Sequence, residues 1–111
     1  MVKVITSGPT ELLVAIRKAI SDGTVATWDS TPQGSITHTA ASGQWKNKAW
    51  FRGVVGDDGI IFNIIRPKGS NVSSEVYAIY HGRLAEMLLA HFDASIESIE
   101  ITSLAGDGDV V

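Results

Sequence analysis

Apolar residues recur at helical spacing in two segments of the chain. The first segment lies between Ser7-Gly8-Pro9, a typical helix start, and Gly23, which suits the position just after a helix. The second begins after Ser73 or Ser74, either of which can cap a helix, and continues to about Phe92. The pattern therefore predicts two amphipathic helices.

Six stretches rich in β-branched and aromatic residues predict strands. They are residues 2–6, 24–29, 35–40, 48–55, 60–66 and 98–104. Thr31-Pro32-Gln33-Gly34 and Gly56-Asp57-Asp58-Gly59 predict turns, and residues 41–47 a connection. The order β-α-β-β-β-β-α-β predicts an α+β fold in which two helices pack on one face of a mainly antiparallel sheet.

Composition narrows the class of protein. The chain has 111 residues, of which 44% are hydrophobic and 19% charged, as expected for one folded domain. The absence of cysteine excludes disulfides, thiolate zinc sites and a cysteine nucleophile. The N-terminus lacks the apolar run of a signal peptide, and no stretch is apolar enough for a membrane span, so we expect a cytoplasmic protein. We expect residues 1–104 to form the domain and the Gly/Asp-rich residues 105–111 to form a flexible acidic tail.

Side-chain alternation separates the two faces of the hairpin formed by residues 48–55 and 60–66. One face is apolar and is predicted to join the core: Ala49, Phe51, Gly53, Val55, Ile60, Phe62 and Ile64. The other face mixes apolar and polar residues: Lys48, Trp50, Arg52, Val54, Ile61, Asn63 and Ile65.

Tryptophan and arginine often anchor protein interfaces. We therefore expect a non-enzymatic binding or assembly module in which a second copy or another protein docks on this face. The predicted contact residues are Trp50, Arg52, Ile61, Asn63 and Ile65. In the alternatives, strand twist or residues 41–47 cover this face within the monomer, or the register is shifted by one residue.

A second hypothesis concerns Lys68-Gly69-Ser70-Asn71, between a strand and the start of the second helix. Backbone N–H groups and the helix dipole can hold an anion there, with Tyr77 and His81 nearby. This predicts a site for a small molecule or a phosphate ester, which would be either a binding site or the active site of an enzyme. The spacing differs from that of a nucleotide-binding loop, which favours an ordinary turn and helix cap.

Charge is distributed unevenly along the chain. Residues 46–83 contain six basic and three acidic residues, whereas the rest contains three basic and nine acidic residues. Residues 45–50 also interleave tryptophan with lysine, as single-stranded nucleic-acid sites do. The net charge of −3 and the absence of a known nucleic-acid motif argue against such a partner and favour a solvated strand edge guarded by lysines.

The second helix carries polar rings on its core-facing side: Tyr77, Tyr80, His81 and His91. Structural hydrogen bonding is favoured over an acid–base pocket. His81 and His91 lack the spacing of helical metal ligands, and Asp107-Gly108-Asp109 lacks the rest of a calcium loop. We therefore predict no catalytic residue, metal or cofactor, and an enzyme is the less favoured class.

Three segments, residues 44–50, 63–71 and 80–93, resemble small bacterial proteins of unknown function. This resemblance implies a bacterial cytoplasmic protein and assigns no activity.

Overall fold

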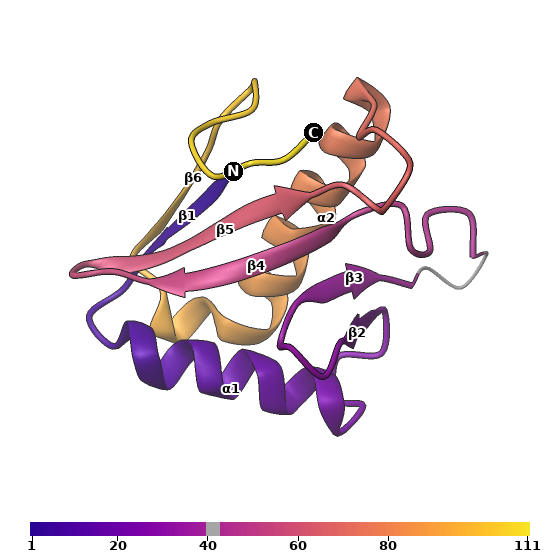
Figure 1. The fold of residues 1–111 in the computed structure, drawn as a ribbon. Helices are drawn as coiled ribbons and strands as arrows, with labels where there is room; N and C mark the ends of the chain where they lie inside the picture. The colour runs from indigo at the N-terminus through magenta and orange to yellow at the C-terminus, as the bar shows by residue number, and fades with distance from the viewer. Residues whose placement is uncertain (40–42) are drawn as a thin grey trace.

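The structure is a computed structural model that describes residues 1–39 and 43–111 (Figure 1). The strands are β1 (Val2–Ile5), β2 (Trp28–Ser30), β3 (Ile36–His38), β4 (Trp50–Val55), β5 (Gly59–Ile65) and β6 (Ser98–Ile101). The helices are α1 (Pro9–Ser21), α2 (Ser74–Phe92) and the short 3-10 helix η1 (Asp93–Ser95). The strands form one antiparallel sheet in the order β2-β3-β4-β5-β1-β6. The predicted fold class and element order are confirmed.

The β4–β5 hairpin has the predicted register, with Val55 opposite Ile60 and Trp50 opposite Ile65. Its turn is closed by a hydrogen bond of 2.8 Å from the Gly56 N–H to the Gly59 carbonyl oxygen. Gly59 lies so close to β1 that a Cβ atom there would stand 2.0 Å from the Val4 carbonyl oxygen. Only glycine permits this approach of the two strands.

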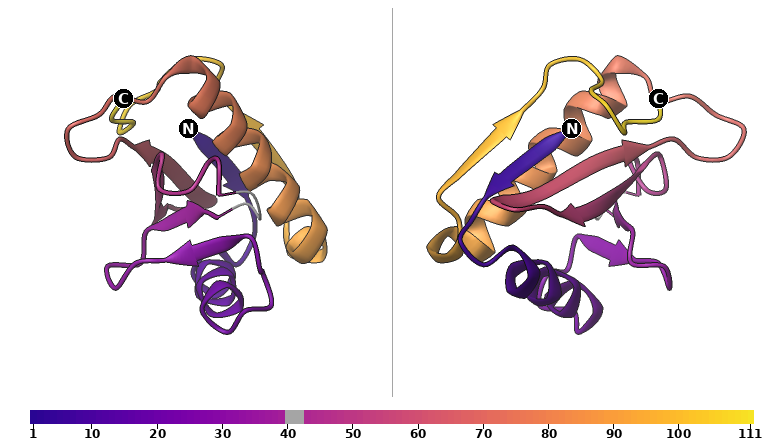
Figure 2. Two further views of the ribbon diagram at one scale, coloured as in Figure 1. Left: turned by 90° about the vertical axis from the view of Figure 1, so that its right-hand side faces the viewer. Right: turned by 60° about the vertical axis from the view of Figure 1, so that its left-hand side comes forward.

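Both helices cover the same face of the sheet. A Cβ atom at Gly53 would lie 2.9 Å from Cδ1 of Leu13 in α1, and the ring of Tyr80 in α2 lies 6.3 Å from that of Phe51. Phe51 and Gly53 are two residues apart on β4 and therefore share a face. In Figure 1, α2 passes behind β4 and β5, and the left view of Figure 2 shows this helix beside the sheet.

The helices begin largely as expected and bury their apolar sides. Pro9 stands in the first turn of α1, and the hydroxyl of Ser73 caps α2 by accepting a hydrogen bond from the Val76 N–H. The prediction that His91 faces the core is wrong: its neighbour Phe92 packs against the core, and His91 is exposed. Among the residues that the structure describes, neither helix is long and apolar enough to span a membrane.

The C-terminal residues lie beside the sheet. Val110 forms a parallel bridge with Ile65, and its backbone exchanges hydrogen bonds with Ile64 at 2.8 Å and Arg66 at 2.7 Å. The carboxylate of Asp109 accepts a hydrogen bond of 2.9 Å from the ammonium group of Met1. These contacts continue the pairing along β5 past Phe62, where its pairing with β1 ends. The flexibility that we expected of residues 105–111 stays a prediction.

Candidate binding face

The side of the β4–β5 hairpin that points away from the helices carries the predicted contact residues. Alternation along the two paired strands places six side chains there: Trp50, Arg52, Val54, Ile61, Asn63 and Ile65, which we call the outer face. Trp50, Ile61 and Ile65 are half-buried, whereas Arg52 is exposed and Val54 is 52% exposed. Two apolar cross-strand pairs, Trp50–Ile65 and Val54–Ile61, thus flank a central Arg52–Asn63 pair.

Trp50 lies at the edge of an open hollow of about 290 Å³. Arg52 and Ile65 line it from the hairpin, while Thr31, Gln33 and Ser35 line it from the turn between β2 and β3. The hollow therefore combines an indole, a guanidinium group and several hydrogen-bonding side chains. One alternative is that residues 41–47 cover this face within the monomer. Of these, residues 41 and 42 lie outside the described residues.

Asn63 differs from the other residues of the outer face. Its Nδ2 donates hydrogen bonds to the Asp107 carbonyl oxygen at 3.0 Å and to Oδ1 of Asp109 at 3.1 Å. The side-chain amide is therefore used to hold the C-terminal segment. Of the two polar residues predicted to contact a partner, Arg52 is therefore better placed than Asn63 to donate hydrogen bonds to that partner.

The loop that precedes β4 is held by Tyr80, a residue that sequence reasoning had assigned only to structural bonding. The Tyr80 hydroxyl donates to the Trp45 carbonyl oxygen and accepts from the Lys48 N–H at 3.2 Å. It also contacts Oγ1 of Thr37 at 3.2 Å. Because Tyr80 is fully buried, its hydroxyl group attaches residues 45–48 to the core, and the side chain of Trp45 also packs against the core.

Lys68 stands in a separate tight turn. The Ser70 N–H donates to the Pro67 carbonyl oxygen at 3.2 Å, and Gly69 has φ +82°, as the third residue of a type II turn requires. The Val72 N–H donates to the Val111 carbonyl oxygen at 3.1 Å. The Ser70 N–H, a backbone donor of the predicted anion site, and the adjoining Val72 N–H are therefore already bonded within the chain.

Tyr77 and His81 belong to a different cluster. The Tyr77 hydroxyl donates to the Thr102 carbonyl oxygen at 2.8 Å and accepts from the Met1 ammonium at 2.9 Å. The His81 ring stacks on Tyr77 at 3.8 Å, and its Nδ1 lies 2.7 Å from the Tyr77 carbonyl oxygen. Burial lowers the pKa of His81 to about 4. This histidine is therefore neutral at physiological pH.

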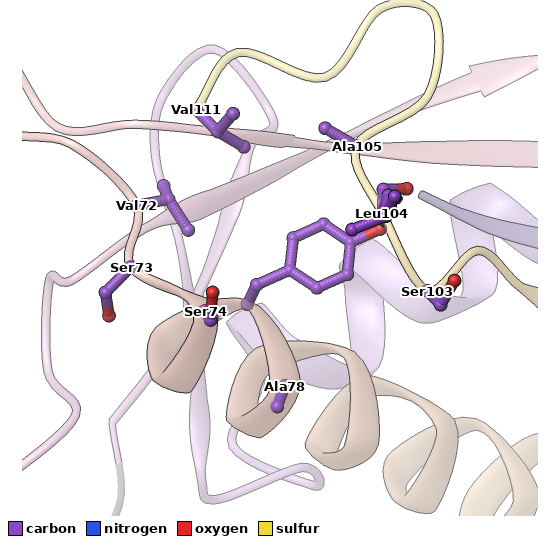
Figure 3. A pocket seen from close by; sticks show the side chains of 9 residues that line it. Val72, Ser73, Ser74, Ala78, Ser103, Leu104, Ala105 and Val111 are labelled. Carbon is purple, nitrogen blue, oxygen red and sulfur yellow. Dashed lines mark hydrogen bonds between the residues drawn. The ribbon is translucent and has the colours of Figure 1, made fainter.

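A cavity of about 460 Å³ lies next to Tyr77 at the start of α2. Figure 3 shows Val72 and Val111 on one side of it and Ser103 and Leu104 on the other. Lys68, Gly69 and Ser70 are not among the residues described as lining it. Within residues 1–39 and 43–111, no three His, Asp or Glu side chains gather as a metal site would require.

No family model, curated protein or solved structure matches this chain. Its function has to follow from its own geometry. All five residues predicted to contact a partner share the outer face. The residues predicted to bind an anion divide between the Lys68 turn and the Tyr77–His81 cluster.

Proposed function

We propose that this protein is a non-enzymatic binding module that docks a macromolecular partner on the outer face. One observation carries the proposal: both helices cover the opposite side of the sheet, so Trp50 and its neighbours face outward. Half-buried apolar side chains around an exposed arginine are the composition of an interface centre. A second copy of the chain or another macromolecule would bury this surface.

Trp50→Glu tests this proposal without knowledge of the partner. We expect the variant to fold as the wild type does and to bind less of an anionic aromatic dye, because the charge disrupts the exposed apolar surface. The dye is anilinonaphthalene sulfonate, measured by fluorescence on the native protein. Val14→Glu is the matched control, since Val14 is 60% exposed on α1 and should leave dye binding unchanged.

Light scattering across a concentration series on the same three proteins asks whether the partner is a second copy. A wild-type dimer that Trp50→Glu converts to a folded monomer would place the interface on the outer face. The proposal fails if Trp50→Glu unfolds the protein, because Trp50 then belongs to the core. It also fails if the native wild type neither binds the dye nor self-associates.

The alternative, a site for a small molecule or phosphate ester, has the cavity beside Tyr77 in its favour. Apolar residues and three serines, Ser73, Ser74 and Ser103, line this cavity, whose volume is within the range of ligand pockets. Chemical-shift titration with inorganic phosphate and nucleotides would test it. An absence of shifts at residues 68–74 would contradict this alternative.

A further inference from the structure

Two paired segments of the chain concentrate its positive charge. Residues 43–56 and 59–74 contain five of the nine Lys and Arg residues and none of the twelve Asp and Glu residues. The five are Lys46, Lys48, Arg52, Arg66 and Lys68, and all are exposed. The pairing of Trp50 with Ile65 brings both segments to one end of the hairpin, where the two loops lie in Figure 1.

None of these five cations is neutralised by an ion pair in the part of the chain that the structure describes. The ion pairs found there join other groups: Met1 to Asp109, Lys3 to Asp58, and Arg83 to Glu86. The guanidinium group of Arg66 donates to the uncharged side-chain amide of Asn71, at 3.3 Å. The positive charge of this end is therefore available to a partner.

The loops that carry these cations are ordered by internal bonds. Tyr80 holds residues 45–48 through the Trp45 carbonyl oxygen and the Lys48 N–H. Between the two lysines, Asn47 has φ +56°, a left-handed conformation that asparagine tolerates better than most residues. A binding surface in which cations are already positioned loses less entropy on association.

Trp50 adds an aromatic ring to this charged surface. It borders the hollow with Arg52, so a flat ring could stack there beside a guanidinium group. Cations along a backbone and a ring for stacking are the two components of single-stranded nucleic-acid sites. We propose that the partner of the outer face is single-stranded nucleic acid, with Trp50 stacking on a base and the five cations contacting phosphates. This inference rests on the proposed docking function.

Charge also bears on the choice between the candidate partners. A second copy whose two-fold axis passes close to Arg52 would bring this residue next to its own copy, which costs free energy. The negative net charge of the chain does not prevent binding. Charges farther away than about 10 Å are largely screened at 0.1 M salt, and the molecule measures 36 × 30 × 23 Å. The local cations therefore contribute strongly to the field at this end, where Asp107 and Asp109 also lie, against Asn63.

The test is a titration with fluorescein-labelled oligothymidine and oligouridine of about 12 nucleotides, read by anisotropy. If all five cations contact phosphates, the slope of log affinity against log salt should approach about −3.5, since each contact on a single strand contributes about −0.7. Affinity should then fall about 100-fold between roughly 50 and 200 mM salt. Comparison of the two probes distinguishes DNA from RNA.

Three variants separate stacking from charge. Trp50→Ala should weaken binding roughly tenfold or more, because stacking on an aromatic side chain is lost. The double variant Lys46→Gln/Lys68→Gln should reduce the salt slope by about 1.4, because two phosphate contacts are removed. Lys18→Gln is the matched control: it removes an exposed cation on α1 and should leave affinity and slope unchanged.

Two results would overturn the inference. One is no binding of either probe at low salt. The other is binding that Trp50→Ala leaves unchanged and that inorganic polyphosphate or polyglutamate displaces equally well, which indicates an acidic partner without bases. If the wild type forms a dimer that Trp50→Glu dissociates and binds no probe, the docking function stands and this inference falls. If Trp50→Glu unfolds the protein, both fall.

Discussion

His81 is enclosed so tightly that the fold opposes its protonation. The residue is 2% exposed, and its ring lies between Tyr77, at 3.8 Å, and Phe51, at 5.1 Å. Nδ1 carries the proton, because it faces the Tyr77 carbonyl oxygen, and Nε2 has no hydrogen-bond partner among the described residues. Of the nearby charges, the Met1 ammonium lowers the pKa of His81 and the Asp109 carboxylate raises it.

The free energy of unfolding should therefore decrease as the pH is lowered through the range in which His81 titrates. In the unfolded chain this histidine binds a proton near pH 6.5, but in the folded chain only near pH 4, so stability present above 6.5 is lost on acidification towards 4. We expect a loss of up to about 2 kcal/mol by about pH 4.5, measured by urea unfolding. His81→Phe should reduce this dependence and leave the contribution of His38, whose pKa burial also lowers. His91→Phe, at an exposed position, should not. Equal pH profiles for the two variants would contradict this account.

At the scale of elements, Tyr80 connects α2, β3 and the loop before β4. Tyr80→Phe removes the acceptor of the Lys48 N–H and the donor to the Trp45 carbonyl oxygen, so we expect a loss of about 1–3 kcal/mol in the free energy of unfolding. Hydrogen exchange at the Lys48 amide should also accelerate. Tyr77→Phe is the control, because its hydroxyl contacts Met1 and Thr102 instead. If both variants accelerate hydrogen exchange at the Lys48 amide equally, Tyr80 does not hold the loop before β4.

The elements differ in how far the sequence predicts them. The hairpin register follows from local signals, namely a Gly-Asp-Asp-Gly turn between two alternating strands, and it is correct. β2 and β3 are shorter than expected, with three residues each.

Long-range contacts could not be predicted from the sequence. The contact between Met1 and Asp109 spans 108 positions and leaves no local pattern. The gathering of five cations becomes visible only once the register is known, although the absence of acids from both segments could have indicated it.

At the scale of the whole molecule, Asp109 joins the two ends of the chain to the sheet. Its side chain is buried and accepts hydrogen bonds from the Met1 ammonium, the Asn63 amide and the Ile64 N–H. Burial alone would raise the pKa of the Asp109 carboxyl. The Met1 ammonium and the hydrogen bonds outweigh this effect and lower the pKa below its ordinary value. The charged form is therefore the one that stabilises the fold.

Asp109→Asn tests whether residues 105–111 are docked or flexible. If they are docked, the variant should lose about 1–3 kcal/mol at neutral pH, because the Met1 ammonium loses its charged partner. The difference from the wild type should shrink as the pH falls through the lowered pKa, because protonation removes the same charge in the wild type. Asp107→Asn is the control, since only the backbone of Asp107 contacts Asn63. Urea unfolding at neutral and acidic pH measures all three proteins. Equal stability of the two variants would favour a flexible tail, as the composition alone predicted.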